Sequence, residues 1–428
     1  MESHCLTYDT YVEILRRELV LAMGCTEPIA IAFCAAKARS ILEAVPDRIE
    51  IAASGNIIKN VKSVVVPNTN GGRGIAVAAA IGVLAGDAEA GFQVISDVPQ
   101  SAKDALPAYL NDTPVKIYPS DSPYLLDIKV TVCAGAQSAS VRVVNEHTNI
   151  VEITKNGETV LSALPSEAAE PETDGPDYDL LTIRDIYDFA ETCDLNDVRD
   201  IIARQIACNT AIAEEGLKND YGANIGKILL KNDPTSVRNR AKAYAAAGSD
   251  ARMNGCELPV VINSGSGNQG MTASLPVIVY AKALNVSEDK LYRALLISNL
   301  VTLHEKTSIG RMSAYCGAVS AGAGAGCGIA YLYGGGVEEI SHTIVNALAV
   351  TSGIVCDGAK SSCAAKIAMA IESGIFGYEM YQNGQQFFGG DGLVVKGVEN
   401  SITNFGRLGR VGMLETDREI IRMMTEQV

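Results

Sequence analysis

The sequence predicts an α+β protein in which a mainly helical domain, built from both chain ends, carries an inserted smaller α+β domain. Three observations predict this organisation. Residues 8–23 and 27–45 place apolar side chains at helical spacing. Short β-branched or alternating runs then follow as far as residue 162, and the helical pattern returns from about residue 180 to the end.

The inserted α+β domain is expected over residues 47–162. Its strand-like runs, separated by turn residues, are RIEIAAS, SVVVPN, FQVISDV, VKIYPS, LLDIKVTVC, SASVRVVNEHTNIVEIT and GETVLS. Two helices are predicted among them, at GIAVAAAIGVLAGDA and SAKDALPAYL. The acidic, proline-containing segment 163–177 predicts a solvated linker.

The helical domain is expected to comprise residues 1–46 and 178–428. Beyond the linker, glycines separate the predicted helices, which are 182–194, 197–217, 236–248, 288–304, 338–352 and 363–375. The glycine-rich segment 260–279 predicts a loop that leads into a further helix.

The composition is that of a globular protein with an acidic surface. The 428 residues are 47% hydrophobic and 20% charged. Glycine numbers 40 and tryptophan is absent, so we expect a core of small side chains in which helices approach closely. The net charge of −15, without a basic run, argues against partners such as nucleic acid or an anionic membrane surface.

The sequence favours a soluble, cytoplasmic protein. The N-terminus shows no basic region followed by an apolar one, so we expect no signal peptide. Two stretches invite a membrane interpretation, which leaves a small-residue membrane bundle as an alternative. Residues 317–336 are mostly Gly, Ala and Ser, and residues 340–359 contain His342 and Asn346, which favours buried helices for both.

The eleven cysteines are an odd number in such a chain, which argues against a disulfide framework and leaves metal, catalytic and packing roles. Cys316 and Cys327 would lie about 16 Å apart along one helix. Thiolates on an iron–sulfur cluster lie on the order of 6 to 7 Å apart. We therefore expect Cys327 to pack in the core.

Cys356 and Cys363 flank the segment CDGAKSSC, in which Asp-Gly signals a turn and Ser361 or Ser362 can cap a helix. Such a loop could turn both thiols inward, with Cys363 in the first helical turn, where a thiolate is stabilised. Spacing alone leaves cluster ligation and structural packing both open. Zinc is disfavoured, because the chain has four histidines and no CxxC pair.

Cys25 lies in MGCTEP, at a tight turn before a helix. A thiol at a helix N-terminus has a lowered pKa and can act as a base or nucleophile. A turn residue with an idle thiol is the alternative. Two glycine-rich loops, residues 67–80 and 263–274, could hold a carboxylate or phosphate on backbone N–H groups, although neither matches a dinucleotide or P-loop pattern.

The segments MGCTEP, PNTNGGRG, NSGSGNQG, HEKTSIGRMSAYCGAVSAGAGAG and GIVCDGAKSSCAAKIA together resemble the L-cysteine desulfidase family, relatives of the iron–sulfur L-serine dehydratases of alpha-chain type. The resemblance runs along nearly the whole chain. It implies an oxygen-sensitive 4Fe-4S cluster held by Cys316, Cys356 and Cys363, with one iron open to substrate, and Cys25 as the base. The short CDGAKSSC loop, where the serine dehydratases have a longer proline-containing one, favours the desulfidase branch.

The implied reaction is β-elimination of L-cysteine to pyruvate, ammonia and sulfide. Elimination needs a base for the α-proton and a Lewis acid for the leaving group. Loop composition suggests substrate-binding candidates at Asn68, Asn70, Gly71, Ser264, Gly265, Asn268, Lys306, Ser308 and Arg311. L-serine dehydratase activity and a non-catalytic small-amino-acid or redox-sensing role are the alternatives. The expected partner is a small amino acid, and a homo-oligomer is compatible with the sequence.

Overall fold

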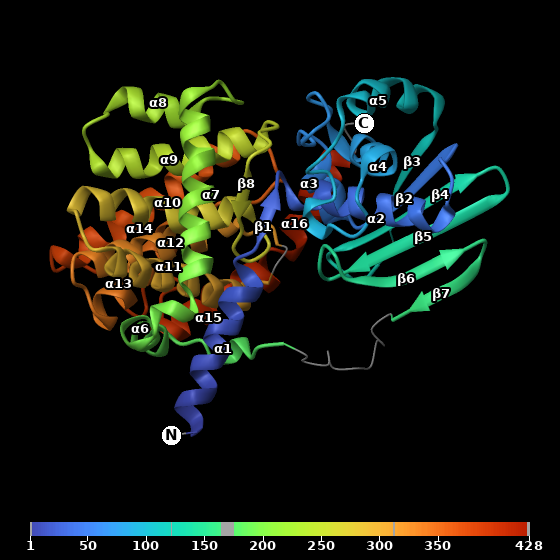
Figure 1. Ribbon diagram of the computed structural model, residues 1–428. Helices are drawn as coiled ribbons and strands as arrows, with labels where there is room; N and C mark the ends of the chain where they lie inside the picture. The colour runs from blue at the N-terminus through green and yellow to red at the C-terminus, as the bar shows by residue number, and fades with distance from the viewer. Residues whose placement is uncertain (1, 121, 164–174, 311–312, 426–428) are drawn as a thin grey trace.

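The computed structural model describes residues 2–120, 122–163, 175–310 and 313–425, with the backbone alone for 2–6 and 425. Figure 1 shows a bundle of helices on one side and a sheet with its own helices on the other. Each side has its own hydrophobic core. The predicted α+β class, with a mainly helical part, is confirmed.

The first core is helical and joins residues from both chain ends. Its helices are α1 (Glu2–Glu18), α6 (Ile183–Thr192), α7 (Arg199–Lys218), α8 (Ile225–Asn232), α9 (Val237–Met253), α10 (Gly267–Leu284), α11 (Glu288–Ile309), α12 (Gly317–Leu332), α13 (Val337–Thr351), α14 (Cys363–Gln382) and α15 (Val398–Arg407). Helix α12 lies at the centre, in contact with α10, α11, α13 and α14, and its side chains are buried on every face from Ala318 onward.

The second core lies between a mixed sheet and the helices that cover one of its faces. The sheet has the order β3-β2-β4-β5-β6-β7, in which only the β2–β3 pair is parallel. Its strands are β2 (Arg48–Ala53), β3 (Val115–Pro119), β4 (Asp127–Ala134), β5 (Gln137–Val144), β6 (Ile150–Lys155) and β7 (Glu158–Ser162). The helices of this part are α2 (Thr26–Leu42), α3 (Gly55–Val61), α4 (Gly74–Ala85) and α5 (Gln100–Asp112).

Buried apolar and partly exposed polar residues alternate along the central strand β4, which explains why helices cover only one face of the sheet. In β4, Ile128, Val130 and Val132 are fully buried, whereas Lys129 and Thr131 between them are partly exposed. Successive strand residues point to opposite faces, so this pattern produces one apolar and one polar face. Helix α2 packs against β4 and β5 and carries the apolar residues that complete the core.

Two predicted strands are wrong. SVVVPN contributes only an isolated bridge between Val65 and Arg73, and FQVISDV forms a short 3-10 turn, η1 (Gly91–Gln93), followed by further turns. The apolar residues of both segments are buried as loops in the second core, which accounts for their strand-like appearance. The short antiparallel pair of β1 (Leu21–Met23) and β8 (Pro259–Val261) was not expected from the sequence.

The two cores do not follow the expected boundary at residue 46. Helix α2 packs on the sheet and not in the bundle, because it is apolar nearly all round and can cover the strands while buried itself. The C-terminal helix α16 (Leu414–Thr425) likewise packs against α3. A buried ion pair of 2.5 Å joins Asp417 of α16 to Lys59 of α3. The expected linker falls largely on residues 164–174, outside the described part, and the division into domains stays a prediction.

Within the described ranges, no helix combines the length and the apolar character needed to cross a membrane. The two small-residue stretches that invited a membrane interpretation form α12 and α13, which pack in the first core.

Helices α12 and α14 touch backbone to backbone through glycine. A Cβ on Gly374 would lie 2.9 Å from the carbonyl carbon of Gly322 and 3.3 Å from the amide nitrogen of Gly326. A Cβ on Gly322 would in turn meet the backbone of Ala370. Both sets of contacts advance along the two helices in the same direction, so α12 and α14 run parallel and their N-termini lie at the same end.

We expect Gly374→Ala to lower the free energy of unfolding by about 1–3 kcal/mol or more, because the added methyl forces these helices apart. Urea denaturation measures this. The matched control is Gly353→Ala, since nothing lies within 4 Å of a Cβ at that position. Equal unfolding midpoints for the two variants would contradict the close helix contact.

Candidate active site

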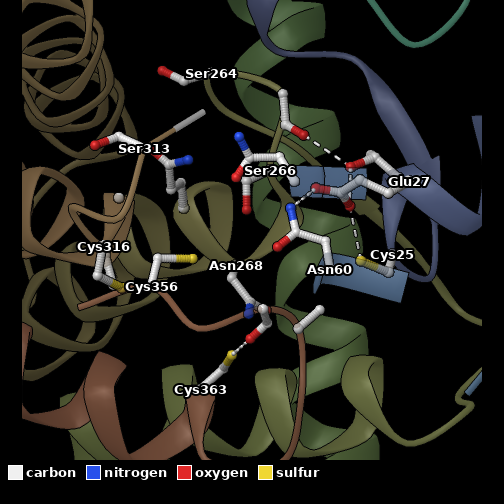
Figure 2. A pocket seen from close by; sticks show the side chains of 18 of the residues that line it. Cys25, Glu27, Asn60, Ser264, Ser266, Asn268, Ser313, Cys316, Cys356 and Cys363 are labelled. Atoms are coloured by element: carbon white, nitrogen blue, oxygen red, sulfur yellow. Dashed lines mark hydrogen bonds between the residues drawn. The ribbon is translucent and has the colours of Figure 1, made fainter. Parts of the chain in front are cut away.

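A cavity of about 140 Å³ lies where the two cores meet. Its walls come from the turn before α2, from α3, from the end of α9, from the start of α10 and from the segments that precede α12 and α14. Figure 2 shows Cys316, Cys356 and Cys363 on one side of this cavity and Cys25 with Glu27 on the other. The structure therefore brings together residues that are more than 300 positions apart in the sequence.

Backbone pairing places Cys316 beside Cys356. The amide of Cys316 donates to the carbonyl of Ile354 at 3.1 Å, and the amide of Cys356 donates to the carbonyl of Ala314 at 2.6 Å. Cys316 is the N-cap of α12 and Cys363 is the first residue of α14. Because those helices run parallel with their N-termini at one end, both thiols arrive at the same wall of the cavity.

The loop from Cys356 to Cys363 is held in place by charge and by glycine. Asp357 forms ion pairs with Lys360, at 2.7 Å, and with Lys366, which also donates to the carbonyl of Val355 at 2.8 Å. Gly358 has a φ of +94°, and a Cβ there would meet the backbone of Lys59. The Asp-Gly turn thus brings the loop against α3, in a conformation that favours glycine.

The three thiols form a donor set suited to an iron–sulfur cluster. Each is free and partly exposed, whereas most of the other described cysteines are buried. Burial raises the pKa of the Cys316 thiol to about 12, with further contributions from Cys356 and Cys363, so the three lie within electrostatic reach of one another. No three His, Cys, Asp or Glu side chains of the described residues are arranged around a single ion. A cubane cluster binds each thiolate through a different iron, so its ligands stand farther apart.

Cys25 is placed by a turn that requires glycine. Gly24 has a φ of +56°, and a Cβ there would lie 2.9 Å from Cδ of Pro67, so the loop after α3 packs directly on this turn. Cys25 is the N-cap of α2 but its side chain does not cap the helix. The adjacent Thr26 donates to the carbonyl of Gly265 at 3.1 Å, which links the turn to the loop before α10.

The expected lowering of the Cys25 pKa is wrong. Burial raises the pKa of this thiol well above its usual value, and the negative charge of Glu27 raises it further. The thiol donates to Oε2 of Glu27 at 3.0 Å. Burial would also raise the pKa of Glu27, but His147, the bond from Cys25 and Arg252 outweigh that effect and lower it. The resting pair is therefore a protonated thiol and an ionised carboxylate.

Four of the predicted substrate-binding residues line the cavity, namely Ser264, Gly265, Asn268 and Lys306. Ser264 has a left-handed φ of 50°, which allows the tight turn closed by the backbone pair Asn263–Ser266. The turn ends at the start of α10, whose first residues face the cavity.

Asn68, Asn70, Gly71 and Ser308 do not line the cavity, and Arg311 lies outside the described residues. Asn68 is turned away, donating to the carbonyl of Ile95 at 2.8 Å and accepting from Lys103 at 2.9 Å. Its loop packs against the turn at Gly24 through Pro67. Ser308 follows Lys306 by two positions, so it lies on another face of α11 and packs against Gly406.

Sequence reasoning missed several polar residues of the cavity, namely Glu27, Asn56, Lys59, Asn60, His147, Arg252 and Gln269. Asn56 and Asn60 are one turn apart on α3, and Asn60 donates to Glu27 at 2.9 Å. Glu27 stands within MGCTEP, so that motif could have indicated it. Arg252 gives no comparable signal, because a cation in the last turn of a helix is commonplace.

Of the remaining described cysteines, Cys193, Cys208, Cys256 and Cys327 pack in or against the first core and Cys34 packs in the second, while Cys133 is buried on strand β4. Cys327 is fully buried in the first core, as expected, and its pKa is raised by burial. All ten cysteines of the described residues are free thiols.

Comparison with known proteins shows similarity along the whole chain. The profile of the serine dehydratase alpha chain matches residues 89–422. A UPF0597 protein of Desulfitobacterium hafniense is 55% identical over 427 residues, covering 100% of this chain and 99% of its own. UPF0597 proteins of Finegoldia magna and Bacteroides fragilis are 47% and 36% identical over 418 and 422 residues, covering 97% of this chain and 99% and 97% of their own.

We expect Glu27→Gln to lower the pKa of the Cys25 thiol, because the variant removes the negative charge that stabilises the protonated form. The rate of iodoacetamide labelling at Cys25, followed across pH by peptide mass spectrometry, measures this. Wild type should label half-maximally above about pH 8.5, the value of an ordinary thiol, and the variant at lower pH. Glu214→Gln, on the exposed side of α7, is the control. Identical pH profiles for all three proteins would contradict the pairing.

Proposed function

The chain belongs to the serine dehydratase alpha-chain family, and we propose that it is a lyase that converts L-cysteine to pyruvate, ammonia and sulfide by β-elimination. The observation that supports this most is the single cavity lined by Cys25 and by Cys316, Cys356 and Cys363. It would place a group able to move a proton opposite a set of metal-binding thiols. Membership of the family by itself supports a lyase without naming the substrate.

Cys316, Cys356 and Cys363 would hold a 4Fe-4S cluster as thiolates. When bound, the cluster would supply a Lewis-acidic iron, not ligated by protein, for the sulfur that leaves. Burial raises the pKa of both Cys316 and Cys363, and the positive N-terminal ends of α12 and α14 act against that rise. Lys366, near both thiols, adds positive charge at the same place.

Cys25 and Glu27 would handle the α-proton. The 3.0 Å hydrogen bond gives the thiol proton a direct acceptor in Glu27. Burial and Glu27 raise the pKa of the thiol, and the positive charge of Arg252 acts against that rise, so Arg252 would help Cys25 to pass its proton to Glu27 during the reaction. Cys25 then takes the α-proton of the substrate. The electrons of that C–H bond form the Cα–Cβ double bond, the C–S bond breaks, and its electron pair leaves with sulfur as hydrosulfide. The enamine product tautomerises and is hydrolysed by water to pyruvate and ammonia.

L-serine dehydratase activity is the second candidate, because the matching profile is that of a serine dehydratase alpha chain. The same acid–base pair would serve, with hydroxide as the leaving group. A non-catalytic protein that binds a small amino acid or senses redox state would use the same cavity without turnover. We also propose a cytoplasmic location, since free thiols suit a reducing compartment.

Anaerobic reconstitution with iron and sulfide tests the proposal. We expect the wild type to show iron–sulfur absorbance and to release sulfide and pyruvate from L-cysteine faster than pyruvate from L-serine. Cys25→Ala should keep the absorbance and lose on the order of 10²–10⁴ in kcat, the usual contribution of a general base. Cys356→Ala should lose both absorbance and activity.

The matched control is Cys208→Ala. It removes a partly exposed thiol on α7 that does not line the cavity. It should keep both properties. Wild-type protein that binds no iron would refute the cluster, and cluster-loaded protein without turnover of either amino acid would favour the non-catalytic alternative. Faster turnover of L-serine would move the assignment to the dehydratase.

A further inference from the structure

The guanidinium of Arg252 is a buried cation that forms no ion pair with a carboxylate of the described residues, although its charge acts on Glu27 from a greater distance. Arg252 lies in the last turn of α9, is 2% exposed and lines the cavity. Among the described residues, no carboxylate forms an ion pair with it and its Nε has no hydrogen-bond partner. A buried charge without a partner is costly, so this side chain points to an anionic ligand.

The start of α10 reinforces this positive wall. A Cβ on Gly267, the first residue of α10, would lie 2.8 Å from Cζ of Arg252, so glycine lets the guanidinium rest against the helix end. Ser266 provides no side-chain cap, which leaves the first N–H groups of this 18-residue helix for a ligand. The helix dipole and the guanidinium therefore favour a negative group at the same place.

Other walls of the cavity offer buried acceptors. The side-chain oxygens of Asn60, Asn268 and Gln269 have no hydrogen-bond partner among the described residues. The amide of Asn60 donates through Nδ2 to Glu27, which leaves its Oδ1 as the free acceptor. Gln269 packs against Gly317, where a Cβ would lie 2.5 Å from its Cδ. These oxygens, with the ionised Glu27 close by, suit a positively charged donor.

We propose that Arg252 binds the α-carboxylate of the substrate and that Asn60 and Gln269 accept hydrogen bonds from its α-ammonium group. The cavity then takes α-amino acids in which both groups are free. An arginine fork matches a carboxylate with two hydrogen bonds, whereas an ammonium needs acceptors of the amide or carboxylate type. The inference rests on the proposed function only in taking the same cavity as the substrate site.

Titration calorimetry on the full-length, cluster-free protein tests this under reducing, anaerobic conditions. The probes are L-cysteine, cysteamine, which lacks the carboxylate, and 3-mercaptopropionate, which lacks the ammonium. Wild type should bind L-cysteine more tightly than either of the other two. KM and kcat for L-cysteine on the reconstituted enzyme provide the second measurement.

Arg252→Met should weaken L-cysteine binding about 10- to 100-fold, the usual effect of losing a charge-assisted hydrogen bond. It should also abolish the preference for L-cysteine over cysteamine. Arg252→Lys should keep part of the affinity, because it retains the charge but not the fork. The thermal midpoint of Arg252→Met should equal or exceed that of wild type, since an unpaired buried charge is removed. Arg240→Met, earlier in the same helix and outside the cavity, is the matched control.

The inference is overturned if Arg252→Met binds L-cysteine as tightly as Arg240→Met does, or if it loses binding only together with its fold. Failure of the wild-type cluster-free protein to bind L-cysteine would overturn it as well. A reconstituted enzyme that releases sulfide with an unchanged KM in Arg252→Met would refute this inference and leave the proposed function standing. If the protein binds L-cysteine through Arg252 but never forms a cluster, this inference stands and the proposed function is refuted.

Discussion

The candidate site depends first on the parallel contact between α12 and α14. Gly322 faces Ala370 and Gly374 faces both Gly322 and Gly326, so the two helices meet without intervening side chains. The facing residues are 48 positions apart in the sequence and the helix starts are 46 apart, so the two starts lie within about one turn of each other along the pair. Cys316 therefore stands level with Cys363, and pairing of the segments 314–316 and 354–356 adds Cys356 beside them. Larger side chains at the crossing would separate these helix starts.

The walls of the cavity carry opposite charges that are not joined in an ion pair. Glu27 is ionised on one wall. Arg252, on another wall, has no ion-pair partner among the described residues. Glu27 raises the pKa of Cys25, and Arg252 lowers the pKa of both Cys25 and Glu27. Lys59, in contrast, is neutralised by Asp417 of α16. A buried guanidinium without an ion-pair partner destabilises the site until an anion binds. Together with the hydrogen-bonded carboxylate of Glu27, it is what a site complementary to a small zwitterion requires.

The sequence predicted those features of the site that depend on residues close together in the chain. The Asp-Gly turn and the helix start at Cys363 could be read from CDGAKSSC, and the burial of Cys327 followed from helix geometry. Long-range contacts could not be read in this way. The Cys25 pKa was misjudged because the helix-terminus argument omits burial and the carboxylate two residues away. Asn68 was misjudged because a loop rich in Asn and Gly can support a neighbouring turn as readily as it binds a ligand.

The cavity is lined by residues from two parts of the chain, of which only one is matched by the family profile. The matching profile begins at residue 89, so it covers the three cysteines and Arg252, whereas Cys25, Glu27 and Asn60 precede it. UPF0597 relatives cover both parts. The three thiols proposed to hold the cluster and Arg252 thus lie in the segment that matches the serine dehydratase alpha chain. The residues proposed to handle the proton, Cys25 and Glu27, lie at the start of α2. Helix α3 is joined to α16 through Lys59 and Asp417. The cavity is therefore complete only where the N-terminal wall meets the segment that the profile covers.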